Sequence, residues 1–367
     1  MKTEELSDAN GPESAALAAT LGELTVCLLE AGALRSENEG ACVDETLTMC
    51  VEAWGALAER SLAGQQRATE AAGAGPGQAD TSAAGASVFD AYLRAGLAAA
   101  AASAHEEDDG QEEEGKAGAA ALDERLSSAA RVARAAPDAV LPLLRAATEA
   151  KTNELGACLA NLSNRDSGRD DASEILEQLW WLARLVPHVL CDAFEGEFPL
   201  PPDAVAECAR RAAVADPGGA CPVTETGAAY LRLVGVCLDE RAVRSGAVSP
   251  RLVEQLVWGA ARWADTYLMP EDVGGSAHAA LFGGAPLSAA AIGRLGGDGE
   301  SRVRGGAARA GAPPRPAPFS ETGGGVAAVD ALLRVALVAL TAFPGEESAQ
   351  RVAAKMLLPA LTRRRAL

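Results

Sequence analysis

Residues 174–191, EILEQLWWLARLVPHVLC, decide the fold class of this chain. Apolar side chains in this stretch recur at the spacing of one face of an α-helix: Ile175, Leu179, Leu182, Val186 and Val189. Asp171 and Glu174 have the spacing of a capping box. Pro187 lies in the last turns and predicts a kink or an end there, because proline lacks the backbone N–H that continues a helix.

A second helix is predicted from Ser249 and Pro250, which suit the cap and the first turn. Its inward face consists of Leu252, Leu256, Ala260, Trp263 and Tyr267. The helix is expected to end near Pro270.

Apolar stripes of the same period recur along most of the chain. They occupy residues 21–29, 47–57, 88–97, 140–162, 205–213, 230–238, 326–340 and 352–361. No alternating strand pattern competes with them, and aromatic residues make up only 4% of the chain. The sequence therefore predicts an all-α fold.

The predicted helices follow one another in pairs across short breaks. A single pair cannot bury both of its faces, so stacking into an α-solenoid is the expected architecture. Periodicity alone leaves an ordinary helical bundle open. Loops are expected at 64–85, 98–119, 163–170 and 283–325, and the Gly-, Pro- and Arg-rich composition of the last one predicts disorder.

Charge limits the possible partners. The chain has 32 basic and 51 acidic residues, a net charge of −19, which repels phosphate backbones and favours a basic protein partner over nucleic acid. No apolar run is long and uncharged enough to predict membrane insertion. The cysteines have neither CxxC nor zinc-ligand spacing, and we expect them to be buried, reduced thiols. They are Cys27, Cys42, Cys50, Cys158, Cys191, Cys208, Cys221 and Cys237.

One acidic run is the candidate contact for a basic partner, because a cluster of negative charges attracts a positively charged surface at long range. It comprises Glu106, Glu107, Asp108, Asp109, Glu112, Glu113 and Glu114. Such runs more often form solvated loops without a specific contact.

Tryptophans supply a second set of candidate residues, which could line a groove for a partner: Trp180, Trp181, Trp258 and Trp263. Core packing is the commoner role at this spacing. Trp180 and Trp181 are adjacent and cannot both face the same side, so one of them is the better candidate for a surface between helices.

Catalytic patterns are missing from the sequence. His105, His188 and His278 have no HExxH or triad context, and no Gly-rich loop follows a strand. We therefore expect neither an enzyme nor a bound cofactor or metal.

Several segments resemble a known family in the same order along the chain. Residues 178–202, QLWWLARLVPHVLCDAFEGEFPLPP, and residues 257–268, VWGAARWADTYL, carry the most specific match. Weaker segments support it: 88–93, the acidic run, 126–144, 239–244, 248–250 and 326–361. Together they resemble nuclear export receptors of the importin-β (karyopherin) superfamily, most closely the exportin-4 family.

The resemblance implies a nuclear export receptor built of HEAT-like helix pairs that shuttles between nucleus and cytoplasm. Its implied partners are Ran-GTP, nuclear pore proteins and protein cargo such as the hypusine-containing translation factor. It divides the chain into helical repeats at 1–282 with an acidic loop at about 98–119, a disordered insertion at 283–325, and a final helix pair at 326–367.

The family's receptors are longer, and their N-terminal Ran-binding repeats are not visible, so this chain is expected to be a fragment. The alternative from another class is a helical-repeat scaffold that assembles proteins without Ran.

Overall fold

The computed structural model is helical wherever it is described. It describes residues 12–32, 45–57, 77–105, 112–161, 169–192, 201–216, 221–239, 242–243, 246–268 and 325–362. Within these ranges the regular elements are helices and no β-strand forms, which confirms the all-α prediction.

The chain divides into two compact units, Met1–Leu143 and Leu144–Leu367. The division falls inside helix α5 (Pro137–Asn161), one residue after Pro142. No sequence pattern indicates this division, and residues 1–282 were expected to form a single run of repeats. The insertion predicted at 283–325 lies outside the described residues, apart from Gly325.

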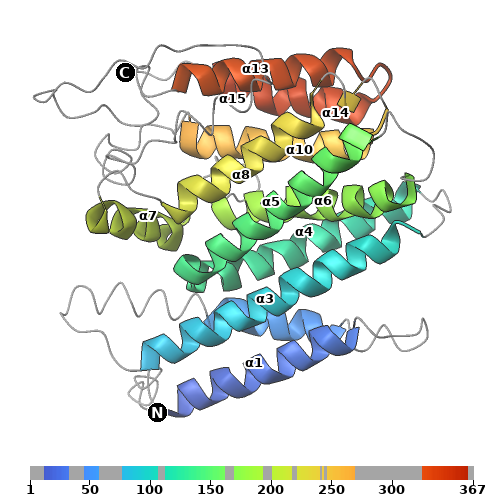
Figure 1. Ribbon diagram of the computed structural model, residues 1–367. Coiled ribbons are helices and arrows are strands. Elements are labelled where there is room, and N and C mark those ends of the chain that lie inside the picture. The colour runs from blue at the N-terminus through green and yellow to red at the C-terminus, as the bar shows by residue number, and fades with distance from the viewer. Residues whose placement is uncertain are drawn as a thin grey trace, which may run out of the picture. The chain divides into compact units, whose positions relative to one another are not determined.

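The first unit contains α1 (Pro12–Gly32), a helix at 45–57, α3 (Gly77–Ser103) and α4 (Glu112–Ala135). α1 and α3 lie side by side (Figure 1). The buried cluster between these helices consists of Ala18, Trp54, Val88 and Val132. Gly22 belongs to it because a Cβ atom there would lie 3.3 Å from Cζ2 of Trp54, so glycine lets α1 approach the indole.

Two of the predicted loops are helical over most of the residues that the structure describes in them, and there the predictions were wrong. α3 includes residues 77–85 and 98–103 of the expected loops, and α4 begins at Glu112, inside the expected 98–119 loop. These segments are rich in alanine, which has the highest helix propensity but leaves no stripe of large apolar side chains. A search for such stripes therefore misses them.

The second unit contains the rest of α5 and the helices that follow it in the chain. Two of its elements are short π-helices that adjoin α-helices. The elements are α6 (Arg169–Leu190), α7 (Asp203–Ala215), α8 (Pro222–Cys237), α10 (Pro250–Trp263), η3 (Ala264–Leu268), α13 (Gly325–Thr341), α14 (Glu347–Val352), η5 (Ala353–Leu357) and α15 (Leu358–Thr362). η3 prolongs α10, and η5 joins α14 to α15.

Contacts along α5 and α8 show that these two helices run parallel. Arg145 forms an ion pair with Glu225, and farther along both helices Arg232 Nη2 lies 2.8 Å from Asn153 Oδ1. The contacts follow the same order on both helices.

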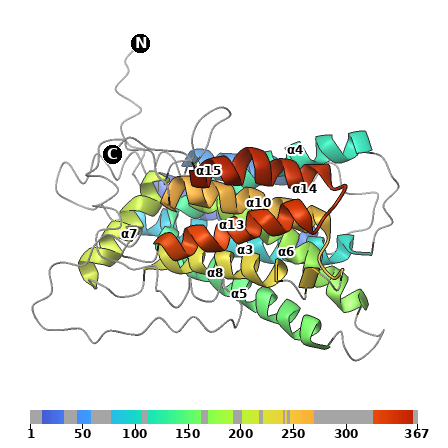
Figure 2. The ribbon, with the colours of Figure 1, turned by 90° about the horizontal axis from the view of Figure 1, so that it is seen from above.

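α6 and α10 also run parallel. Arg251 near the start of α10 pairs with Glu177 of α6, and Arg262 near the end of α10 bonds to Cys191, which follows the last residue of α6. Figure 2 shows α5 and α8 on one side of the second unit and α10, α14 and α15 on the other. The second unit therefore contains two parallel helix contacts, α5 with α8 and α6 with α10.

The stripe predicted on α6 packs inward. Leu179, Leu182, Val186 and Val189 are buried, and Ile175 is half-buried. The helix begins at Arg169, before the predicted capping box, so Asp171 is not its cap. It also continues through Pro187 to Leu190.

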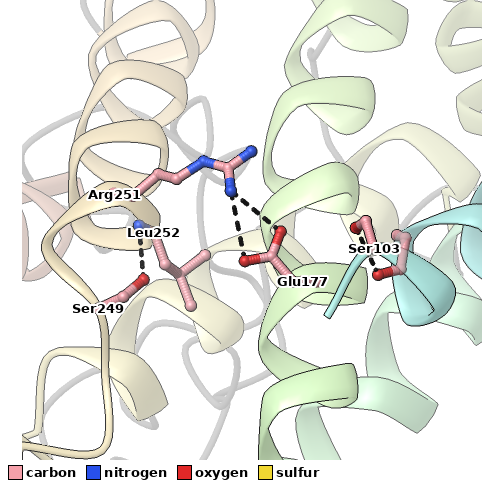
Figure 3. Close-up of polar contacts among 6 residues, drawn as sticks. Ser103, Glu177, Ser249, Arg251 and Leu252 are labelled. Atoms are coloured by element: carbon pink, nitrogen blue, oxygen red, sulfur yellow. Dashed lines mark hydrogen bonds and ion pairs between the residues drawn. The ribbon is translucent and has the colours of Figure 1, made fainter. Parts of the chain in front are cut away.

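The start of α10 is as predicted. The Ser249 side chain accepts a hydrogen bond from the Leu252 N–H at 3.2 Å, which caps the first turn (Figure 3). All five residues predicted to face inward are buried: Leu252, Leu256, Ala260, Trp263 and Tyr267.

The cysteine prediction is confirmed in part. Cys50, Cys191, Cys208, Cys221 and Cys237 are buried free thiols. Cys27 is exposed, Cys158 is half-buried, and Cys42 lies outside the described residues. In the part of the chain that is described, no helix is long and apolar enough to cross a membrane.

Candidate functional site

Trp180 on α6 lies between two arginines. The Arg251 guanidinium of α10 is 3.8 Å from the centroid of the Trp180 ring, and Arg184 of α6 is 5.0 Å from it. Such cation–π contacts contribute about 0.5–2 kcal/mol each, more when they are shielded from water. Trp180 is half-buried and Arg184 is buried, whereas Arg251 is exposed. The guanidinium of an arginine on α10 thus lies over the ring of a tryptophan on α6.

Glu177 fixes the position of Arg251. The Nη1 atom of Arg251 lies 3.3 and 3.4 Å from the two carboxylate oxygens of Glu177 (Figure 3). The Arg251 side chain is 57% exposed, so water screens this ion pair and its contribution to stability is small, about 0–1 kcal/mol. Its role is to orient the guanidinium over the indole ring.

A second tryptophan repeats the arrangement on α10. Arg262 lies 4.8 Å from the centroid of the half-buried Trp258 ring. The His188 ring of α6 is 5.4 Å from the same indole at an interplanar angle of 49°. We define the α6–α10 surface as Glu177, Trp180, Arg251, Trp258 and Arg262.

The four tryptophans predicted as candidates differ in their burial. Trp181 and Trp263 are buried in the core, and Trp180 and Trp258 are half-buried in the α6–α10 surface. Trp180 rather than its neighbour is therefore the tryptophan between helices, which the sequence left open.

Sequence reasoning missed the arginines of this surface. Arg184 and Arg262 each follow a tryptophan by four residues, a spacing that places both side chains on one helix face and was visible in the sequence. Arg251 comes from a different helix than Trp180, and no local pattern brings those two together.

The predicted acidic contact belongs to the first unit, and the α6–α10 surface to the second. Glu106, Glu107, Asp108 and Asp109 lie outside the described residues. Glu112, Glu113 and Glu114 are the first residues of α4. Binding of a basic partner to this run stays a prediction.

Three titratable groups, Tyr92, Tyr230 and Cys237, have pKa values above their ordinary values. Burial raises the pKa of the Cys237 thiol to about 12, and the pKa of Tyr92 to about 12 as well. Burial and the nearby Cys191 and Cys237 raise the pKa of Tyr230 well above its usual value. An activated thiol would need the opposite shift. Within the described ranges, no group of three or more His, Cys, Asp or Glu side chains could hold a metal ion.

No model of a known protein family matches this sequence, and no curated protein matches it. The resemblance to nuclear export receptors therefore rests on the sequence segments themselves. Parts of the two most specific segments, 178–202 and 257–268, fall in α6, α10 and η3, and both contain a tryptophan of the α6–α10 surface.

Proposed function

We propose that this chain is a protein-binding receptor of stacked, HEAT-like helix pairs that works as an exportin-4-like nuclear export receptor. The observation that carries the proposal is the parallel packing of α5 with α8 and of α6 with α10. Parallel packing of equivalent helices in successive pairs is typical of helical-repeat proteins.

Helical repeats suit protein recognition rather than chemistry. Each pair contacts mainly its neighbours, so a run of pairs offers an extended surface that can adapt to large partners. The α6–α10 surface has the composition of a protein contact, because tryptophan and arginine dominate the energetic centres of protein interfaces. Its exposed member, Arg251, and its half-buried tryptophans leave part of the surface open to a partner.

The export role rests on the sequence resemblance. A receptor of that kind binds Ran-GTP and cargo together in the nucleus, passes nuclear pore proteins, and releases both partners in the cytoplasm. The hypusine-containing translation factor is the cargo class that the resemblance suggests. The mechanism needs only coupled binding, in which Ran-GTP tightens the receptor's hold on cargo.

A titration of cargo tests the proposal. The hypusine-containing factor is added to the longest natural form of the protein that contains residues 1–367, with GTP-loaded Ran, with GDP-loaded Ran and without Ran. We expect cargo affinity to rise about 5- to 150-fold with Ran-GTP alone.

The same titration separates the two candidate functions. Cargo binding that is equal in all three conditions would favour the Ran-independent scaffold. No binding of either Ran or cargo would contradict the export role.

A further inference from the structure

Three backbone carbonyls near the end of α6 accept hydrogen bonds from side chains of other helices. The Ala183 carbonyl would accept from residue 187 in a regular helix, but Pro187 has no N–H. Leu190 is the last residue of α6, and Cys191 follows it. Buried carbonyls of this kind need a donor from elsewhere.

Tyr230 of α8 reaches the first of these carbonyls. Its hydroxyl lies 3.4 Å from the Ala183 oxygen and 3.2 Å from the Leu256 oxygen of α10, and the side chain is buried. Gly259 of α10 makes room for this contact, because a Cβ there would lie 2.0 Å from the Tyr230 hydroxyl. The same Cβ would lie 2.5 Å from Cγ of Pro187. The Pro187 ring and the Tyr230 hydroxyl therefore both pack against Gly259.

The other two carbonyls receive donors from α10 and η3. The Tyr267 hydroxyl donates to the Leu190 oxygen, and Arg262 Nη2 donates to the Cys191 oxygen at 3.3 Å. All three donors thus belong to α8, α10 and η3, which lie later in the chain than α6.

We propose that the end of α6 is a proline joint held in place by α8 and α10, with the Tyr230 hydroxyl replacing the amide that Pro187 lacks. In a helix with its full set of amides, bending at this point would break an internal hydrogen bond. In α6 the Ala183 carbonyl is bonded from outside the helix, so the contact couples the end of α6 to α8 and α10. The inference does not depend on which partner the chain binds.

A double-mutant cycle tests the replacement directly. The variants are Tyr230→Phe, Pro187→Ala and the double variant, and the chain's unfolding in urea gives the folded-to-unfolded ratio of each. Pro187→Ala restores an N–H within reach of the Ala183 oxygen. We expect Tyr230→Phe to lower the ratio about 5- to 30-fold in the native background, because a buried carbonyl loses its donor. In the Pro187→Ala background the loss should be no more than about threefold.

Thr152→Val is the matched control. The buried Thr152 hydroxyl donates to the Thr148 oxygen within α5, so its removal should have the same effect in both backgrounds. Hydrogen exchange of the Cys191 amide, which bonds to the Pro187 oxygen at 2.9 Å, should be at least about tenfold faster in Tyr230→Phe than in Thr152→Val.

An equal loss of stability for Tyr230→Phe in both backgrounds would show that the hydroxyl donates to the Leu256 carbonyl instead. That result, or unchanged exchange at Cys191, would overturn the proposal.

Discussion

Gly259 allows α6, α8 and α10 to pack closely together. Without a side chain it lets α10 approach Pro187 of α6 and Tyr230 of α8. Protein interiors are packed closely enough that an added methyl group there has no space to occupy.

Gly259→Ala should destabilise the second unit. Its Cβ would overlap both the Tyr230 hydroxyl and the Pro187 ring, and such overpacking costs about 1–3 kcal/mol or more. Gly156→Ala in α5 is the control, since a Cβ there meets no atom within 4 Å. The control should stabilise the helix by about 0.5–1 kcal/mol. Urea unfolding measures both, and equal stability of the two variants would contradict this account.

Burial of individual residues was predictable where local spacing decides it. The α10 stripe from Leu252 to Tyr267 and the Ser249 cap follow from sequence patterns, and the structure contains both. The role of Gly259 was not predictable, because the atoms that crowd it come from α6 and α8. Contacts between segments far apart in the sequence cannot be predicted from the spacing of residues within one segment.

At the scale of helices, α6 and α10 together create a surface that neither has alone. Arg251 of α10 stacks on Trp180 of α6, and Glu177 holds the arginine in place. Both helices and the tryptophans were predicted from the sequence. The parallel packing of α6 and α10 was not, because it depends on contacts between segments that are far apart in the chain. The alanine-rich parts of α3 and α4 were missed for a different reason, because their helices have few large apolar side chains.

Arg251→Ala should weaken binding of the protein partner about 5- to 30-fold, as loss of an arginine at an interface centre does. Stability should fall by no more than about 1–2 kcal/mol, because the ion pair with Glu177 is exposed to water and a cation–π contact at an exposed arginine contributes about 0.5–1 kcal/mol. Binding is measured by titration calorimetry with the hypusine-containing factor and Ran-GTP.

Arg210→Ala on α7 is the control for this substitution. Arg210 is also exposed and pairs with a glutamate, Glu207, on its own helix, but it contacts no tryptophan of the α6–α10 surface in the described contacts. If both variants bind equally well, the α6–α10 surface is not the contact.

At the scale of the whole molecule, buried protonated groups in both units link stability to pH. The folded-state pKa values of Tyr92 and Cys237 are about 12, above the ordinary values of 10.0 and 9.0, and that of Tyr230 is also raised. A raised pKa means that the folded chain keeps its proton while the unfolded chain loses it. The stabilisation is therefore complete below about pH 9 and is lost as the pH rises toward 12.

Thermal unfolding at pH 8, 9.5 and 11 in reductant should show this loss. We expect Tm to fall by about 5 °C or more between the first and last values. Cys237→Ala should reduce the fall, since one of the linked protons is removed. Cys27→Ala should not, because Cys27 is exposed. A Tm that stays constant to pH 11 would contradict the linkage.

The division of the chain at Leu143 and Leu144 shows where prediction from sequence stops at this scale. The presence of α-helices and their order along the chain follow from the period of apolar residues. The boundary between compact units depends on which helices pack together. The expected architecture of repeats extends the same reasoning, and its support comes from the parallel pairs of the second unit.

The measurement that tests the export role most directly is the affinity of Ran-GTP for the protein with and without saturating hypusine-containing factor. Coupling between two ligands is reciprocal, so cargo must tighten Ran-GTP binding by the same factor by which Ran-GTP tightens cargo binding. We predict equal factors of at least about fivefold in the two directions. Ran-GTP affinity that does not change with cargo, or no Ran-GTP binding, would contradict the export receptor and favour a Ran-independent scaffold.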